Sequence, residues 1–122
     1  MTAKILLVDD SGLTRRSVRQ ILESAGYGVV EAEDGMVALE RYFLEKPDLV
    51  LLDLVMAGMS GLDVLAKLQE LDRDVRVIVV SADVQESSRE MAEAGGAVGF
   101  VIKPVERTGL LRAVAAALEA SR

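Results

Sequence analysis

Four short, unbroken apolar runs recur along this chain of 122 residues, and each ends abruptly at a polar residue. The runs span residues 5–8, 49–52, 77–80 and 100–102, and the residues that follow them are Asp9, Asp53, Ser81 and Lys103. Apolar runs of this length are typical of strands buried on both faces, as in a parallel sheet. A weaker fifth strand, Val29-Val30 with Ala32, precedes the turn signal Asp34-Gly35.

Between and after the strands lie five stretches with the apolar spacing of amphipathic helices. Gly26 and Pro47 mark the ends of the first and second, and Ser60-Gly61 marks the start of the third. The expected buried positions are, in chain order, Val18, Ile21, Leu22 and Ala25; Ala38, Leu39 and Tyr42; Leu62, Leu65, Ala66 and Leu68; Met91 and Ala92; and Leu110, Leu111, Val114 and Leu118. The fourth helix, from about residue 86 to 94, offers the least apolar surface, so we expect it to be the most easily displaced. The fifth is expected to reach Arg122.

Strands that alternate with helices predict an α/β fold in which a five-stranded parallel sheet is covered by helices on both faces. No linker or low-complexity stretch divides the sequence. Residues 1–122 are therefore expected to form a single domain with no output domain attached. Hydrophobic residues make up 51% of the chain and aromatic residues only 3%, so the expected core is aliphatic.

The absence of three residue types excludes several kinds of site. Without cysteine there is no disulfide or thiolate nucleophile, and without histidine there is no His-based acid–base catalysis and no usual zinc site. Without asparagine there is no N-glycosylation sequon. A net charge of -6 argues against nucleic acid or anionic lipid as a partner. Because no apolar stretch is long enough for a signal peptide or a membrane span, we expect a cytoplasmic protein.

The polar residues at the strand ends form the candidate site. In such a sheet, ligands bind outside the carboxyl ends of the strands. The chain would gather there Asp9, Asp10, Asp53, Ser81 and Lys103. Carboxylates that converge repel one another unless a hard cation joins them, and Mg²⁺ prefers oxygen ligands of this kind. A carboxylate is also a nucleophile toward phosphorus, and an ammonium group would neutralise phosphoryl oxygens.

Each of these residues taken alone also has a purely local interpretation. The segment Asp9-Asp10-Ser11 could cap the first helix. Asp53 could begin a turn, and Ser81 could cap the fourth helix or satisfy nearby backbone groups. Lys103 could be a solvated surface lysine. Their joint position at one edge of one sheet, with complementary charges, favours the functional interpretation.

The ordered set of these residues resembles the receiver domain of bacterial two-component response regulators, of the single-domain, chemotaxis-like (CheY-like) type. The matching segments are Asp9-Asp10, Asp53-Leu54-Val55-Met56, Gly58-Met59-Ser60-Gly61, Ser81-Ala82 and Lys103-Pro104. The resemblance implies a flavodoxin-like fold with strand order 2-1-3-4-5. It also implies a phosphorylation-dependent signalling switch rather than an enzyme. Its partners would be a sensor histidine kinase or phosphotransfer protein and a downstream protein target.

The same resemblance implies a role for each residue that would hold the phosphoryl group and its metal ion. Asp53 would be the phosphoacceptor. Mg²⁺ would bind Asp10 and Asp53 directly, Asp9 through water, and the backbone carbonyl of Val55.

Other residues would bind the phosphoryl group or respond to it. Ser81 and the amide of Ala82 would bind phosphoryl oxygens. Lys103 would pair with the phosphate, and a cis bond before Pro104 would help to aim it. Phe100 matches the family's switch aromatic. We expect phosphorylation to move the fourth helix and the loop 81–83, with Phe100 following. The face formed by the fourth helix, the fifth strand and the last helix would then bind the partner.

Three departures from the family pattern occur. Many relatives have proline where this chain has Ala57, so the loop after Asp53 is less rigidly preset. Phe100 lacks a tyrosine hydroxyl, so that only its ring position could carry a signal. Gly95-Gly96 would give the fourth helix flexibility at its end.

Three other functions remain as alternatives. An aspartate-nucleophile phosphatase of the haloacid dehalogenase type would need a second acid two residues after Asp53, where this chain has Val55. A nucleotide-binding domain would need a glycine-rich phosphate motif after the first strand, which instead ends in two acids. A degenerate receiver that acts only as an interaction module would not need the intact set of site residues.

Overall fold

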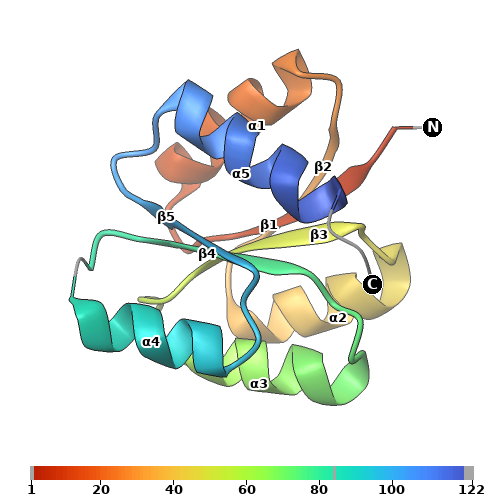
Figure 1. Ribbon diagram of the computed structural model, residues 1–122. Coiled ribbons are helices and arrows are strands. Elements are labelled where there is room, and N and C mark those ends of the chain that lie inside the picture. The colour runs from red at the N-terminus through yellow and green to blue at the C-terminus, as the bar shows by residue number, and fades with distance from the viewer. Residues whose placement is uncertain (1, 84, 120–122) are drawn as a thin grey trace.

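The computed structural model describes residues 2–83 and 85–119, in which five strands alternate with five helices (Figure 1). In chain order these are β1 (Lys4–Val8), α1 (Gly12–Ser24), β2 (Gly28–Ala32), α2 (Gly35–Glu45), β3 (Leu49–Asp53), α3 (Gly61–Leu71), β4 (Val77–Ser81), α4 (Glu86–Ala94), β5 (Gly99–Ile102) and α5 (Arg107–Glu119). The five expected strands are confirmed, most with one additional residue at an end. The expected extension of the last helix to Arg122 lies outside the described residues.

The strands form one sheet in the order β2-β1-β3-β4-β5, and all of the pairings are parallel. This confirms both the fold class and the order 2-1-3-4-5. The register aligns the strand ends, since Val8 lies opposite Leu52 and Asp53 lies opposite Val80. Polar residues that follow these strands therefore meet at one edge of the sheet.

Helices cover both faces of the sheet. In Figure 1, α1 and α5 lie on one face, and α2, α3 and α4 lie on the other. Each face has its own aliphatic core: Val18, Leu22 and Leu110 pack on the first, whereas Val64 and Leu68 pack on the second. Among the described residues, no helix is long and apolar enough to cross a bilayer.

The fifth strand corrects one expectation. β5 pairs with β4 at the edge of the sheet, and its residues are only partly buried, with Ile102 45% exposed. The run 100–102 is thus not buried on both faces, unlike β3 and β4, which are buried throughout. An apolar run records hydrophobicity but does not distinguish a central strand from an edge strand.

Three expected core positions on the helices were wrong. Ala25 follows the last residue of α1 and is exposed, and Ala66 is exposed because Val64 occupies the buried stripe of α3 instead. Met91 is 56% exposed, so that Ala92 is the buried residue of α4. The apolar surface that α4 buries is therefore even smaller than expected.

Candidate functional site

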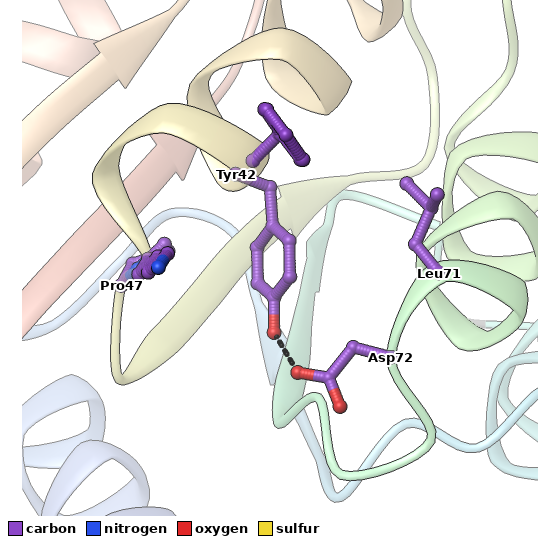
Figure 2. Close-up of a pocket in the computed structure, with 6 residues that line it drawn as sticks. Tyr42, Pro47, Leu71 and Asp72 are labelled. Atoms are coloured by element: carbon purple, nitrogen blue, oxygen red, sulfur yellow. Dashed lines mark hydrogen bonds between the residues drawn. The ribbon is translucent and has the colours of Figure 1, made fainter.

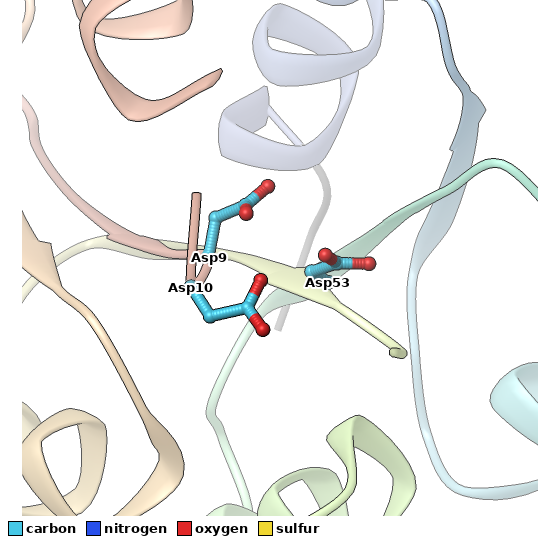
Figure 3. A group of neighbouring side chains, drawn as sticks. All are labelled: Asp9, Asp10 and Asp53. Atoms are coloured by element: carbon cyan, nitrogen blue, oxygen red, sulfur yellow. The ribbon is translucent and has the colours of Figure 1, made fainter. Parts of the chain in front are cut away.

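Three carboxylates converge at the carboxyl edge of the sheet (Figure 3). Asp9 and Asp10 follow β1, and Asp53 ends β3. One oxygen from each lies within 4.8 Å of the others. Asp9 and Asp53 are buried, whereas Asp10 is exposed. The parallel register explains why these side chains lie close together, because β1 and β3 are neighbours and Val8 lies opposite Leu52, the residue before Asp53.

Lys103 bridges the two buried acids from the loop after β5. Its Nζ lies 3.0 Å from Oδ2 of Asp9 and 3.2 Å from Oδ2 of Asp53. The side chain is 22% exposed, which excludes the solvated surface lysine considered as an alternative. The peptide bond between Lys103 and Pro104 is cis, and the Lys103 amide donates to the carbonyl of Ser81.

Burial and the neighbouring opposite charge shift the pKa of Asp53, and likewise that of Lys103, in opposite directions. Burial raises the pKa of Asp53, and the charge and hydrogen bond of Lys103 only partly offset that effect. Burial alone would lower the pKa of Lys103, but hydrogen bonding to Asp9 and the nearby charge of Asp53 raise it overall. The ammonium group of Lys103 therefore partly compensates the charge of the buried Asp53 carboxylate.

The same polar side chains also stabilise the local backbone. Oδ1 of Asp9 accepts from the Ser11 amide at 2.8 Å, and Ser11 in turn caps α1 through the amide of Thr14. Oδ1 of Asp53 accepts a hydrogen bond from the Val55 amide. The local interpretations and the functional one are therefore compatible, because each carboxylate keeps its second oxygen for the centre of the site.

Comparison with known proteins agrees with this geometry. Residues 5–115 match the family model of the response regulator receiver domain. This chain belongs to that family. It is 37% identical to chemotaxis protein CheY of Bacillus subtilis, over 93% of this chain and 96% of that protein. It is 34% identical to chemotaxis protein CheY of Halobacterium salinarum, over 98% of this chain and all of that protein.

A solved structure shares the fold closely. A chain of the CheX-CheY-BeF3-Mg²⁺ complex from Borrelia burgdorferi matches this receiver domain with a TM-score of 0.93 at 32% identity. The match covers 97% of this chain and 90% of that chain. Together with the family match, this supports a CheY-like receiver domain of two-component signalling.

Ala57, one of the departures from the family pattern, makes a backbone contact at the site. Its amide donates to Oδ2 of Asp10 at 3.3 Å. Proline has no amide hydrogen and could not make this bond. The loop that follows β3 is thereby tied to the exposed acid that follows β1.

The acidic cluster is chemically suited to Mg²⁺. Its atoms are carboxylate oxygens, which hard divalent cations prefer, and they are close enough to share one ion. One ammonium group faces the two buried acids of the cluster, so a cation would relieve repulsion. Val55, whose carbonyl was expected to join them, lies in the loop after β3 with its side chain 72% exposed.

The expected phosphoryl-binding residues lie on the neighbouring strand. Ser81 ends β4 and is fully buried, and its Oγ accepts from the Asp83 amide at 3.0 Å. It does not cap α4, which begins after Gln85 without a side-chain cap. Ala82 follows in an exposed position. The structure thus brings Ser81 and Ala82 to the same edge of the sheet as Asp53.

Phe100 and the glycine pair flank α4. The guanidinium carbon of Arg89 on α4 lies 5.5 Å from the centroid of the Phe100 ring. This cation–π contact joins α4 to Phe100, the expected switch aromatic. A Cβ on Gly95 would lie 2.8 Å from a methyl carbon of Leu65. Gly96 has a φ of +100°, a backbone conformation that residues with a side chain rarely adopt. The glycine pair therefore has packing and backbone roles, and its function as a hinge stays a prediction.

Two contacts at the site could not be predicted from the sequence. A Cβ on Gly61 would collide with the carbonyl oxygen of Asp53 and the Cα of Leu54, so α3 can begin this close to β3 only with glycine. Arg15 of α1 donates to the backbone carbonyl of Asp9 at 2.7 Å. Neither contact follows from hydrophobic periodicity, because both depend on how helices approach the strand ends.

A separate apolar pocket of about 430 Å³ lies between the carboxyl-terminal ends of α2 and α3 (Figure 2). Those ends precede β3 and β4, so the pocket lies at the opposite edge of the sheet from the acids. The Tyr42 hydroxyl donates to Asp72 at 2.7 Å across it. Burial, followed by the hydrogen bond to Asp72, raises the pKa of Tyr42.

Proposed function

We propose that this receiver domain is a phosphorylation-dependent switch of a two-component system in which Asp53 is the phosphoacceptor. The observation that carries the proposal is the position of Asp53. It lies beside two further carboxylates and accepts a hydrogen bond from Lys103 in a largely buried site. A nucleophilic carboxylate beside a fixed cation suits phosphoryl transfer, in which charge spreads over three oxygens.

In the proposed reaction, a carboxylate oxygen of Asp53 forms a bond to phosphorus. The bond between phosphorus and the donor's leaving group, a histidine nitrogen or an acetate oxygen, breaks, and its electron pair leaves with that group. Lys103 then pairs with a phosphoryl oxygen. The Ser81 hydroxyl and the Ala82 amide donate hydrogen bonds to the other oxygens.

Asp10 and Asp53 would hold Mg²⁺ directly, with Asp9 acting through water and Val55 through its carbonyl. When bound, the ion would supply charge neutralisation at the phosphoryl oxygens. The close approach of the three carboxylate oxygens supports this assignment.

The signal would leave through the face formed by α4, β5 and α5. Its apolar side chains include Met91, Val98 and Ile102, which are 56%, 51% and 45% exposed. A groove of about 310 Å³ lies between β5 and α5 along Phe100 and Pro104. A phosphoryl group that draws Ser81 inward would pull on the chain leading into α4, and the ring of Phe100 would follow.

The remaining parts of the proposal concern the setting. Residues 1–122 would act as one cytoplasmic receiver domain. A histidine kinase or phosphotransfer protein would donate the phosphate, and a protein target would read it, without nucleic acid or membrane as partners. The domain would assist only its own phosphorylation and dephosphorylation, and would turn over no other substrate.

Radiolabelled acetyl phosphate with Mg²⁺ tests the proposal. We expect one phosphate per chain in the parent protein and none in Asp53→Asn, whereas Asp74→Asn, at an exposed position, should label normally. Equal labelling of Asp53→Asn would disprove the assignment. Multiple turnover of a phosphate ester would instead support the phosphatase alternative.

A further inference from the structure

A partly buried network of charged side chains joins α1 to β2 next to the acidic cluster. Arg15, on the first turn of α1, donates through Nη1 to the carbonyl oxygen of Asp9 at 2.7 Å and through Nε to Glu31 of β2 at 2.9 Å. Arg19, one turn further along α1, also pairs with Glu31. The Arg15 side chain is 18% exposed, and that of Glu31 is 29% exposed.

The carbonyl that Arg15 holds belongs to the peptide bond between Asp9 and Asp10. That peptide plane sets the direction in which the Asp10 side chain leaves the backbone. The Asp9 carboxylate is held independently by the Ser11 amide and Lys103. Asp10 is the exposed member of the cluster, and its side-chain hydrogen bond is a 3.3 Å contact with the Ala57 amide. The orientation of Asp10 therefore depends most on its backbone.

We propose that Arg15, braced by Glu31, is a positioning residue that orients Asp10 for divalent cation binding. The inference rests on the proposed function, because it assigns Mg²⁺ to the acidic cluster. A planar guanidinium donates in two directions at once, so it links the turn after β1 to β2 in one geometry. A group of this kind acts through the ligand that it orients and does not touch the ion.

The charge of Arg15 and its positioning role should change the affinity for Mg²⁺ in opposite directions, which makes the proposal testable. A nearby positive charge repels a cation, so its removal should strengthen Mg²⁺ binding if charge alone matters. If Arg15 orients Asp10, its removal should weaken binding. The chain offers two matched controls on the same helix. Arg16 is exposed, and Arg19 contacts Glu31 but makes no contact with the carbonyl of Asp9 among the described residues.

The experiment is a titration of each metal-free variant with MgCl₂, followed by calorimetry or amide chemical shifts, with no phosphodonor present. We expect Arg15→Ala to bind Mg²⁺ about tenfold more weakly than the parent protein. Arg16→Ala and Arg19→Ala should bind as tightly as the parent or slightly more tightly. If Arg15→Ala fails to fold, Arg15→Lys replaces it, and we expect at least about a threefold loss because an ammonium lacks the planar fork.

Each outcome bears on one claim. Binding by Arg15→Ala as tight as that of Arg16→Ala, or full affinity in Arg15→Lys, overturns the positioning role. An equal loss in Arg15→Ala and Arg19→Ala also overturns it, because general loosening of the network would then be the cause. A parent protein with no Mg²⁺ response overturns the metal assignment of the proposed function instead. Labelling of Asp53 is judged separately.

Discussion

The ammonium group of Lys103 lies 3.2 Å from a carboxylate oxygen of Asp53, although 50 positions separate the two residues in the chain. The contact joins the end of β3 to the loop after β5, two strands away. The same ammonium also bonds to Asp9, so it compensates the charge of both buried acids.

Replacement of Lys103 by an uncharged residue should destabilise the protein in the absence of metal. Lys103→Met leaves Asp9 and Asp53 buried without their counter-charge, and we expect a loss of roughly 1–3 kcal/mol in EDTA. Urea unfolding measures it. The double variant Asp53→Asn/Lys103→Met should recover part of the loss, because one of the two stranded charges is then gone. Strictly additive losses would show that the pair is not coupled.

Asp10→Ala should have opposite effects with and without metal. Its loss relieves repulsion among the three carboxylates, so the metal-free protein should gain up to about 1 kcal/mol. The increase in melting temperature caused by Mg²⁺ should shrink, because a ligand is lost. Glu40→Ala, at an exposed position of α2, removes the same charge and serves as the control. An undiminished Mg²⁺ shift in Asp10→Ala would contradict the metal assignment.

Gly61→Ala should be far more harmful than an ordinary glycine replacement. The new Cβ would meet the carbonyl oxygen of Asp53, which cannot move without shifting the strand end, and we expect a loss of about 1–3 kcal/mol. Gly109→Ala is the matched control within α5, where no atom beyond the adjacent helix backbone lies within 4 Å of the added carbon. It should gain about 0.5–1 kcal/mol from helix propensity. Similar thermal unfolding of the two variants would refute the close-approach argument.

The charge network behind the site predicts a pH-dependent stability. The hydrogen bond from Arg19, assisted by Arg15, lowers the pKa of Glu31 below its ordinary value of 4.5. The stabilisation is therefore fully present above about pH 4.5 and is lost as the pH falls through the lower folded value. Glu31→Gln should cost about 1 kcal/mol at neutral pH. The difference from the parent protein should shrink in acid. A constant difference from pH 7 to pH 3 would contradict the assigned cause.

The proposed movement on phosphorylation can be tested by amide exchange. With beryllofluoride and Mg²⁺, we expect altered protection across residues 81–105, including α4, because this helix buries little apolar surface. Ser81→Ala should confine the change to the residues that touch the phosphate mimic, since the hydroxyl can no longer draw the loop inward. The same wide change in Ser81→Ala would show that Ser81 does not couple the site to α4. No change beyond the phosphate contacts in the parent protein would exclude the proposed movement.

The sequence by itself determined the fold class and most of the acidic site. Strands buried on both faces admit few polar residues, so the runs 49–52 and 77–80 stand out, and Asp53 and Ser81 are the polar residues that end these strands. The rule that ligands gather at the carboxyl ends of parallel strands then places Asp9 and Lys103 with them. The order of the strands came from the family resemblance and not from periodicity.

Tertiary structure alone decided which elements are neighbours and how closely they approach. The run 100–102 is as apolar as the others, yet β5 lies at the edge, because pairing and not composition determines strand position. The contact of Arg15 with the Asp9 carbonyl and the collision that Gly61 avoids arise from the approach of α1 and α3 to the strand ends. Periodicity records which side chains avoid water, and it contains no information about distances between elements that are far apart in the chain.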